Sequence, residues 1–330
     1  MRKIKIAQIG TSRYSHGNEI FKTLVENPDV FEVVGYALPE NEREKFPQNM
    51  GRFEGYREMT VEEILNDPEI EAVTVETEEI YLSKYALMAA KAGKHMHMEK
   101  PGGRELEDFE KLISIVKENQ TVFHTGYMYR YNPCLISIID RIKKGEIGDI
   151  ISVEAQMSGW RDFEWTDWLS TFPGGMMFYL GCHLIDLVLR IQGMPERILP
   201  FNKSSGVYDT KAQDYSFALF EYKNGVSFVK TTQVERGGFM RRQLVITGSK
   251  GKFEVRPLEA SIAYPLQTTE YLECMSDAWN AVGETFKSEP YDRYTDMMRS
   301  FAAMVRGEKE NPYTYDYELE LYKTVLKCCQ

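Results

Sequence analysis

The chain has 330 residues, of which 40 are basic and 50 acidic, so its formal net charge is −10 at pH 7. This length exceeds one small core and predicts two domains, each able to bury most of its apolar surface. The negative charge disfavours nucleic acid and anionic membrane surfaces as partners, so we expect a small-molecule ligand.

The first residues, Met1 to Ile6, lead into an apolar strand and lack the apolar core of a signal peptide. No apolar run approaches membrane-spanning length, so we expect a cytoplasmic protein. The cysteines are scattered and odd in number, without paired metal-ligand spacing, so we expect reduced thiols and no metal site. They are Cys134, Cys182, Cys274, Cys328 and Cys329.

Short β-rich runs alternate with helical periods through the first 125 residues, which predicts a doubly wound parallel sheet of the Rossmann type. Thr60 and Glu63 form a capping-box pattern, and Gly93 closes a helix predicted over 83–92. The predicted strands cover 3–9, 31–38, 72–77, 95–98 and 121–125.

Longer strands follow a helix predicted over 133–144, and Asn224-Gly225 joins two of them as a hairpin. Adjacent antiparallel strands of this kind predict an α+β domain with a large, open, mostly antiparallel sheet. We therefore expect a dinucleotide-binding domain over 1–125 and a second domain over 126–330. The strands are predicted over 150–159, 216–222, 226–234, 243–248 and 252–255, and late helices over 292–306 and 316–327.

The turn after the first strand is the candidate dinucleotide site, because glycines there let the backbone approach a pyrophosphate and the helix N-terminus supplies donors. Only Gly10 matches the G-x-G-x-x-G pattern in register. Ser12 and Ser15 replace the other two glycines, and Gly17 comes two positions late, so the pattern alone is weak. The residues expected to bind the cofactor here are Gly10, Thr11, Ser12, Arg13 and Tyr14.

Leu38 stands at the end of the second strand, where an acidic residue commonly takes the ribose hydroxyls. Glu40 or Glu42 would repel a 2′-phosphate, which favours NAD(H) over NADP(H), whereas Arg13 would reverse this preference. After the third strand, Glu78 and Glu79 bring negative charge towards the expected pyrophosphate. This charge would weaken dinucleotide binding unless both side chains turn into water.

Glu99-Lys100-Pro101 ends the strand predicted over 95–98 and places a lysine at the edge where such sheets bind ligands. Lys100 there can move a proton or hold a substrate hydroxyl, while a solvated lysine in a turn is the simpler alternative. His183 lies in an apolar helix, where a histidine buried in the core is the alternative to a catalytic one.

Several short motifs occur together along the chain. They are Ala89-Ala90-Lys91-Ala92-Gly93-Lys94-His95, Glu99-Lys100-Pro101, Gly126 with Arg130-Tyr131-Asn132-Pro133, Gly145-Glu146-Ile147-Gly148, Gly174-Gly175, Gly181-Cys182-His183-Leu184-Ile185-Asp186 and Gly248-Ser249-Lys250-Gly251. On these motifs the chain resembles the Gfo/Idh/MocA family of sugar and cyclitol oxidoreductases over essentially its whole length. The resemblance implies NAD(P)-dependent hydride transfer, a substrate-binding second domain, and a homodimer or homotetramer formed through the open sheet.

The resemblance also implies roles for individual residues. Lys100 would lie beside the nicotinamide and the substrate carbon, next to a cis peptide bond, and His183 would complete the acid/base pair. Tyr179 replaces a common aspartate one helical turn before His183 and is either an assisting acid or a half-buried aromatic. The remaining implied positions are Leu38, Thr77, Glu99 and Arg130 for the cofactor, and Met128 and Tyr129 for the sugar.

Trp160, Trp165 and Trp168 gather with Arg161 after the first long strand of the second domain. Aromatic faces stack on sugar rings, so Trp160 and Arg161 are candidate substrate residues; a packed aromatic loop or a subunit contact is the alternative. We therefore expect an oxidoreductase that moves hydride between NAD(H), or less favourably NADP(H), and a sugar, cyclitol or related polyol. The rivals are a lyase or glycosidase of the same family that retains NAD and oxidises its sugar transiently, and a cofactor-poor binding or regulatory protein.

Overall fold

The computed structural model describes residues 2–330. The chain divides into two compact units: the first runs to Tyr127 and also includes Tyr294–Tyr322, and the second comprises Met128–Arg293 and Lys323–Gln330. This differs from a single division at residue 125, because 294–322 return to the first unit. Among the described residues, no helix is both long and apolar enough to cross a bilayer.

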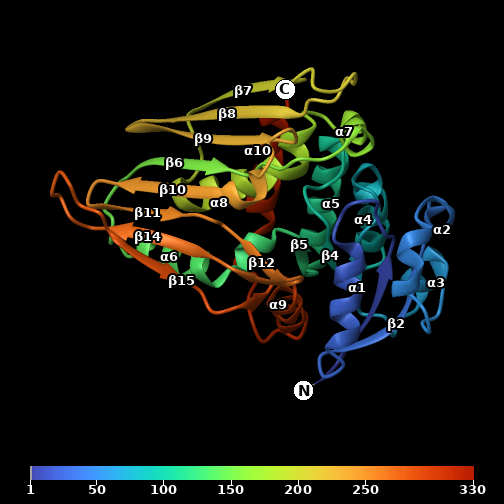
Figure 1. The fold of residues 1–330 in the computed structure, drawn as a ribbon. Helices are drawn as coiled ribbons and strands as arrows, with labels where there is room; N and C mark the ends of the chain where they lie inside the picture. The colour runs from blue at the N-terminus through green and yellow to red at the C-terminus, as the bar shows by residue number, and fades with distance from the viewer. Residues whose placement is uncertain (1) are drawn as a thin grey trace. The chain divides into compact units, whose positions relative to one another are not determined.

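A five-stranded parallel sheet with the order β2-β1-β3-β4-β5 forms the centre of the first unit (Figure 1). Every residue of β3 is buried, which is typical of a parallel strand covered by helices on both faces. The predicted Rossmann-type fold is confirmed. The strands are β1 (Ile4–Ile9), β2 (Phe31–Ala37), β3 (Ala72–Val75), β4 (His95–Met98) and β5 (Phe123–Thr125).

The helices of the first unit begin and end close to the sequence signals. At the start of α3, Thr60 Oγ1 accepts a hydrogen bond from the Glu63 N–H, and the Glu63 carboxylate accepts one from the Thr60 N–H, which confirms the capping box. The segments are α1 (Gly17–Glu26), α2 (Glu42–Lys45), η1 (Pro47–Arg52), α3 (Val61–Asn66), η2 (Glu79–Tyr81), α4 (Leu82–Lys91), α5 (Leu106–Asn119), α9 (Thr295–Val305) and α10 (Tyr315–Cys328), the last of which crosses the unit boundary.

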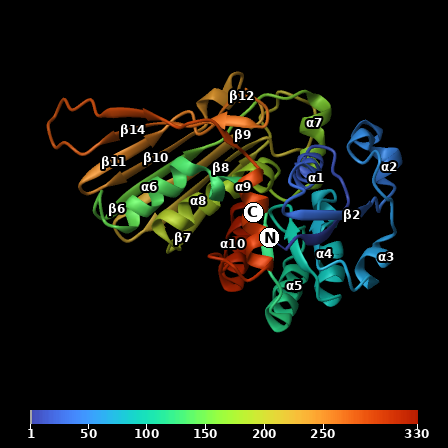
Figure 2. The same cartoon turned by 90° about the horizontal axis from the view of Figure 1, so that it is seen from below.

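An eight-stranded sheet with the order β15-β14-β11-β10-β6-β9-β8-β7 dominates the second unit (Figure 1). Neighbouring strands pair antiparallel except β6 and β9, which run parallel, so the predicted mostly antiparallel sheet is confirmed. Helices α6 (Pro133–Lys143) and α8 (Cys182–Gln192) lie along one face of this sheet (Figure 2). The strands are β6 (Ile150–Gln156), β7 (Arg197–Lys203), β8 (Tyr215–Tyr222), β9 (Gly225–Thr232), β10 (Gln243–Gly248), β11 (Gly251–Val255), β14 (Glu270–Cys274) and β15 (Glu284–Lys287).

The opposite face of this sheet carries aromatic side chains near β7. Phe220 is buried while Phe217, three residues earlier on β8, is only partly covered, so the two rings lie on opposite faces. The rings of Phe201, Phe217 and Phe228 are neighbours across three strands, with centroids 6.4 Å and 5.3 Å apart.

The sequence patterns missed β7 because Pro200 interrupts it, and a proline is tolerated there because β7 is an edge strand.

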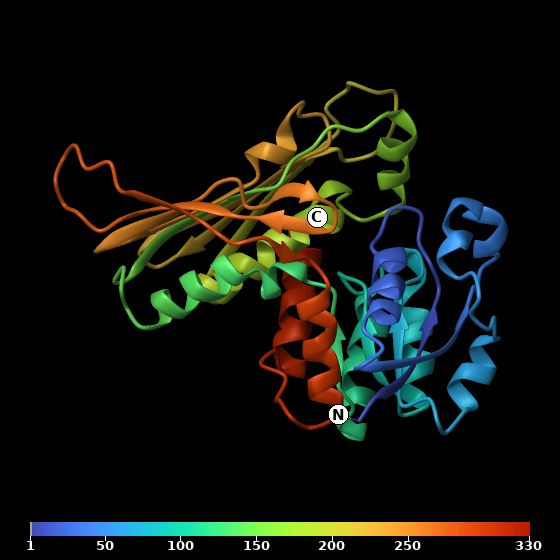
Figure 3. The same ribbon diagram turned by 60° about the horizontal axis from the view of Figure 1, so that its bottom comes forward.

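The remaining elements of the second unit are short and were not predicted from the sequence patterns. The loop that joins β14 and β15 extends beyond the end of the sheet (Figure 3), and Trp279 in this loop is fully exposed. These elements are η3 (Met128–Tyr131), α7 (Phe163–Trp168), η4 (Leu169–Thr171), a π-helical turn η5 (Met177–Gly181), η6 (Gly238–Arg241), and a small sheet of β12 (Ala260–Ala263), β13 (Leu266–Thr268) and β16 (Tyr291–Asp292).

Candidate active site

The turn between β1 and α1 requires glycine at two positions. Gly10 has a φ of 90°, and a Cβ atom placed on it would lie 2.4 Å from Thr77 Cγ2. Gly17 begins α1, and a Cβ atom there would lie 2.9 Å from Glu76 Cβ. Gly17 therefore allows the close packing of helix on strand that the third glycine of the usual pattern provides. This explains a glycine that the sequence pattern could only describe as out of register.

Side chains of the same unit occupy several polar groups of this turn. The Thr11 N–H donates to Glu42 Oε2 at 3.0 Å, and the Ser15 N–H donates to Ser12 Oγ at 2.8 Å. Asn49 Nδ2 donates to Thr11 Oγ1 at 2.9 Å and to the Ser12 carbonyl at 3.0 Å. Hydrogen bonds within the unit thus hold the turn. Ser12 Oγ accepts from the Ser15 N–H, which would have no such acceptor if position 12 were glycine.

Arg13 and Tyr14 complete the predicted cofactor residues of the turn. The Arg13 guanidinium forms an ion pair with Glu78, with Nε 3.7 Å from Oε1, and stacks over the Phe46 ring. Arg13 is therefore held by an acid of the same unit, which weakens the argument that it would select a 2′-phosphate. Tyr14 is partly buried.

The three residues that could bind the ribose, Leu38, Glu40 and Glu42, lie in different environments. Leu38 packs against the cluster formed by Phe21, Tyr36 and Phe53 and offers no polar side-chain atom. The Glu40 carboxylate accepts hydrogen bonds from Lys84 Nζ at 2.5 Å and from the Tyr85 hydroxyl at 2.7 Å.

Glu42 is the acid that reaches the turn, through the Thr11 N–H. Its side chain is buried, and burial raises the pKa of Glu42 to about 9, against the opposing effect of the Thr11 hydrogen bond.

Lys100 lies at the end of β4, before a cis peptide bond to Pro101 as predicted. Its side chain is only 2% exposed, so it is not a solvated turn lysine. Glu99 Oε1 lies 3.4 Å from Lys100 Nζ, and Glu76 and Glu79 are fully buried nearby. The alternative in which Glu79 turns into water is excluded, because η2 begins at this residue and its carboxyl group is enclosed.

The buried carboxyl groups around Lys100 resist ionisation. Burial raises the pKa of Glu79 to about 8, with Lys100 acting in the opposite direction. Burial also raises the pKa of Glu76 well above its usual range and raises that of Glu99. Sequence patterns had not singled out Glu76, although a glutamate inside a run of buried β-branched residues is an unusual feature in itself.

Two histidines extend this group of buried polar side chains. His97 Nε2 lies 3.5 Å from Glu76 Oε1, and His97 Nδ1 lies 2.7 Å from His124 Nδ1. Burial lowers the pKa of His97 to about 3, so its ring is neutral near pH 7. Thr77, the remaining predicted cofactor residue of this region, is fully buried and meets Gly10.

In the second unit, His183 lies in the first turn of α8 and is 2% exposed. The Tyr129 ring packs edge-on against the His183 ring, with centroids 5.6 Å apart. Tyr179 precedes it in η5, a π-helical turn, so the predicted same-face spacing of an α-helix does not apply. The Tyr179 ring packs against Trp165 and Trp168, with centroids 5.2 Å and 5.1 Å apart.

Gly174 and Gly175 serve the packing of the second unit. Both have positive φ, and Cβ atoms there would lie 2.6 Å from Cys329 and 2.3 Å from the Gln213 carbonyl oxygen. Gly174 and Gly175 are therefore required because atoms of the chain itself fill the space beside them.

The aromatic group of the second unit divides into two parts. Trp165 and Trp168 are buried in and around α7, whereas Trp160 is 42% exposed with the Arg236 guanidinium 4.8 Å above its ring. The Arg161 side chain is exposed, and its main chain bonds to Gln233 and to the Tyr208 hydroxyl. A packed aromatic core thus accounts for two tryptophans, and Trp160 and Arg161 remain open to a ligand.

Arg130, Met128 and Tyr129 lie in or next to η3 and are all buried. Arg130 binds Asp186 of α8 through Nε and Nη2, with the shortest contact 2.8 Å, so an ion pair holds its guanidinium. The Tyr129 hydroxyl donates to Glu259 at 2.8 Å.

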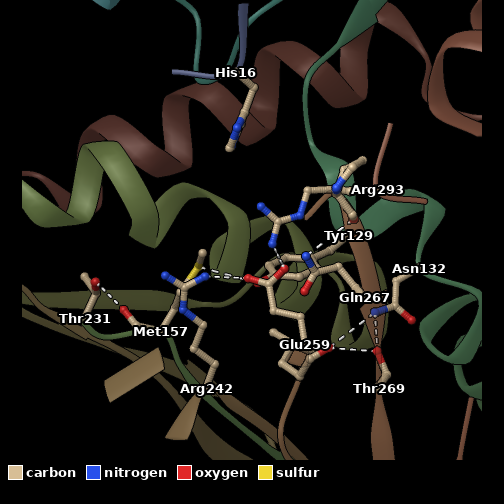
Figure 4. Close-up of polar contacts among 12 residues, drawn as sticks. His16, Tyr129, Asn132, Met157, Thr231, Arg242, Glu259, Gln267, Thr269 and Arg293 are labelled. Atoms are coloured by element: carbon tan, nitrogen blue, oxygen red, sulfur yellow. Dashed lines mark hydrogen bonds and ion pairs between the residues drawn. The ribbon is translucent and has the colours of Figure 1, made fainter. Parts of the chain in front are cut away.

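Glu259 is the centre of a buried network that sequence patterns did not reveal. Figure 4 shows Arg242 and Arg293 approaching its carboxylate from two sides while Tyr129 donates to it. Burial would raise the pKa of Glu259, but the two guanidinium groups outweigh burial and lower it to about 2. The network therefore fixes the Tyr129 ring that packs on His183.

No group of three or more side chains suited to a metal ion occurs among residues 2–330. Family models match both units of the chain. The model described as an oxidoreductase family with an NAD-binding Rossmann fold matches residues 4–127, and the GFO/IDH/MocA C-terminal domain matches residues 137–254. The chain belongs to the GFO/IDH/MocA oxidoreductase family. The predicted resemblance, the oxidoreductase class and the nucleotide-binding domain are thereby confirmed.

Relatives of this family carry different activities in their names. The scyllo-inositol 2-dehydrogenase (NADP(+)) IolW of Bacillus subtilis is 27% identical over 67% of this chain and 61% of the relative. The levoglucosan dehydrogenase of Pseudarthrobacter phenanthrenivorans is 27% identical over 64% and 59%. The 2,7-anhydro-N-acetylneuraminate hydratase of Escherichia coli is 25% identical over 62% and 56%. The chain thus aligns with about three fifths of the length of these relatives.

Solved structures share the complete fold. A levoglucosan dehydrogenase in complex with NADH and levoglucosan has a TM-score of 0.79 at 18% identity, covering 99% of this chain and 97% of that chain. The 3-ketoreductase KijD10 of Actinomadura kijaniata, in complex with NADP and TDP-benzene, has a TM-score of 0.79 at 17% identity, covering 98% and 96%. At these identities the likeness concerns the fold alone.

Proposed function

We propose that this protein oxidises a CH–OH group of a sugar, cyclitol or related polyol, or reduces the corresponding carbonyl, with NAD(H) as the hydride carrier. The observation that carries the proposal is the buried Lys100 at the end of β4, in the same unit as a turn that keeps the glycine requirements of a dinucleotide site. The named activities of the inositol and levoglucosan dehydrogenases support a polyol substrate.

The residues of the first unit fit a dinucleotide. Gly10 takes the positive φ of the tight turn and packs against Thr77, and the N-terminus of α1 faces the turn with its positive dipole end. The nicotinamide, when bound, accepts or returns the hydride.

Glu42 would bind ribose hydroxyls, taking the role that Leu38 cannot perform. The Glu40 carboxylate, together with the Arg13–Glu78 pair, favours NAD(H) over NADP(H).

Lys100 would take the proton of the reacting hydroxyl during oxidation and return it during reduction. His183 would hold the same substrate oxygen by a hydrogen bond, and Tyr129 would fix the orientation of the His183 ring. Tyr179 would assist through its phenol, while Met128, Trp160 and Arg161 would line the sugar site.

We further propose that the chain forms a homodimer or homotetramer through the uncovered face of the large sheet. The support is the row of partly exposed rings formed by Phe201, Phe217 and Phe228, because apolar surface of this kind is stabilised by a partner.

A second candidate is a reaction without net oxidation, in which the cofactor stays bound and the substrate is oxidised only transiently. The hydratase among the relatives favours it, because hydration changes no net oxidation state. The same Lys100 and His183 would serve both reactions.

A panel of sugars and cyclitols, including levoglucosan and scyllo-inositol, tests the proposal. Each compound is incubated with the protein and NAD⁺ or NADP⁺ while the absorbance of the reduced cofactor is followed. We expect at least one compound to reduce NAD⁺ faster than NADP⁺. Conversion of a compound, detected by mass spectrometry, without accumulation of reduced cofactor would replace the dehydrogenase by the second candidate. No conversion and no binding of either dinucleotide would contradict both.

A further inference from the structure

Glu76, Glu79 and Glu99 surround Lys100 at the carboxyl ends of β3 and β4, and we refer to these four residues as the carboxyl cluster. None of the three carboxyl groups is more than 2% exposed. Both oxygens of Glu76 and of Glu79, and Oε1 of Glu99, lack a hydrogen-bond partner among the described residues. A buried oxygen without a partner destabilises the fold, so this concentration requires an explanation.

Simple charge pairing does not provide that explanation. Three carboxylates and one ammonium group would leave a net charge of −2 in a buried space, and the desolvation of unpaired ions is strongly unfavourable. One or more of the carboxyl groups must therefore hold a proton while the protein is folded near neutral pH. The directions of their pKa shifts agree, since burial raises all three.

We propose that the carboxyl cluster is a buried proton store for Lys100, in which Glu76 and Glu79 are positioning residues that set the protonation state of the lysine. The proposal rests on the proposed function, because it assumes that Lys100 exchanges a proton with the substrate. It adds what that function leaves open, namely where a proton taken by a buried lysine goes.

The step balances without a further reactant. During oxidation the substrate O–H bond breaks and its proton binds the neutral Nζ of Lys100, while the C–H electron pair leaves with its hydrogen as the hydride that NAD⁺, when bound, would accept, and the C=O bond forms. The ammonium group then gives one proton to a carboxylate of the cluster, so an N–H bond breaks and an O–H bond forms. Reduction of a carbonyl runs the same transfers in reverse.

His97 lets Glu76 exist in two protonation states. The neutral ring lies 3.5 Å from Glu76 Oε1 through Nε2 and 2.7 Å from His124 through Nδ1. When His124 donates between the rings, His97 Nε2–H can donate to a carboxylate. When His97 donates to His124, its bare Nε2 can accept from a protonated carboxyl group. The histidine pair therefore accommodates both forms of Glu76 by changing tautomer.

Carboxyl-carbon NMR of the cofactor-free protein, labelled with ¹³C at Glu Cδ, tests the store without any substrate. Glu76→Gln and Glu79→Gln assign the two signals, and Glu78→Gln at the partly exposed neighbour is the matched control. We expect both assigned carbons to titrate well above the ordinary glutamate range. Lys100→Met should raise their proton affinity further, because a positive charge is removed. Signals that titrate at ordinary glutamate values and ignore Lys100→Met would overturn the proposal.

The pH dependence of turnover gives a second readout once the substrate panel yields a substrate. In the pH profile of the oxidation rate, Glu76→Gln should move the acid limb to lower pH while KM stays nearly constant. The reason is that an anionic neighbour no longer favours the ammonium form of Lys100. Glu76→Asp should restore the original limb. An unchanged acid limb of the pH profile in Glu76→Gln would overturn the positioning role of Glu76, even if the enzyme is active. Absence of any substrate would count against the proposed function alone, because the NMR titration requires no substrate.

Discussion

Glu42→Gln isolates one buried carboxyl group at the dinucleotide turn. The Glu42 side chain is buried in the first unit, and its Oε2 accepts the Thr11 N–H at 3.0 Å. Glutamine has the same shape and keeps an oxygen for that hydrogen bond, so the substitution removes the ionisation and little else. Its effect on stability should therefore depend on pH in a way that an ordinary surface change does not.

The size of the effect follows from the pKa of Glu42, which burial raises from 4.5 to about 9. Between these values the folded protein holds a proton that the unfolded chain releases, so the free energy of unfolding falls as pH rises. The slope is about 1.4 kcal/mol per pH unit for one group. From about pH 5.5 to about pH 7.5 the wild type should lose about 2.7 kcal/mol through Glu42, and the variant should not.

Urea denaturation at several pH values in this range measures the difference between the two proteins. Subtracting variant from wild type cancels the other titrating groups, and Glu44→Gln on the exposed side of α2 is the matched control. We expect Glu42→Gln to gain stability relative to the wild type as pH rises and Glu44→Gln to show no such trend. A wild-type minus variant difference that is constant with pH would refute the buried, protonated state of Glu42.

Three further changes test separate parts of the account. Lys100→Ala should lower turnover about 10²–10⁴-fold in a steady-state assay, with nearly unchanged dinucleotide affinity. The control Lys111→Ala, on the exposed face of α5, should have the turnover of the wild type. Full turnover in Lys100→Ala would exclude the acid/base role of Lys100. Ser12→Gly frees the Ser15 N–H and should tighten NAD(H) binding several-fold in a fluorescence titration, and unchanged affinity would mean that the turn binds phosphate in another way. Glu259→Gln leaves the guanidinium groups of Arg242 and Arg293, which are 12% and 10% exposed, without their anion. It should lower the free energy of unfolding by about 3–5 kcal/mol in urea denaturation. The exposed Arg197–Glu221 pair provides the comparison: Glu221→Gln should cost at most about 1 kcal/mol, and equal losses in the two variants would contradict the account of Glu259.

The sequence predicted the elements whose patterns are local. The β4 strand, ending just before Lys100, has the predicted bounds, and the capping box of Thr60 and Glu63 starts α3 as expected. Local patterns failed for β12 and β16, and for β7, where Pro200 disrupts the signal. Such strands form because neighbouring strands supply hydrogen bonds, which is information that a single segment does not contain.

The candidate site shows the same limit at the level of side chains. The end of a predicted strand and the family resemblance indicated Lys100 and His183. Neither could show that Glu79 is enclosed or that Arg130 is held by Asp186, since both depend on contacts between segments distant in sequence. Gly17 is an example, because it is out of register with the glycine pattern, and only the structure shows that Glu76 packs against it. Charged residues inside apolar runs, such as Glu76, are the signal that would have pointed to the carboxyl cluster.

Titration of the protein with NADH tests the central claim most directly. The claim is that the altered turn around Gly10 still binds a nicotinamide dinucleotide in the unit that contains Lys100. We predict saturable binding with one dinucleotide per chain, followed by tryptophan fluorescence or calorimetry, and weaker binding of NADPH. Absence of binding of either dinucleotide at millimolar concentration would contradict the account and leave a family member without the cofactor.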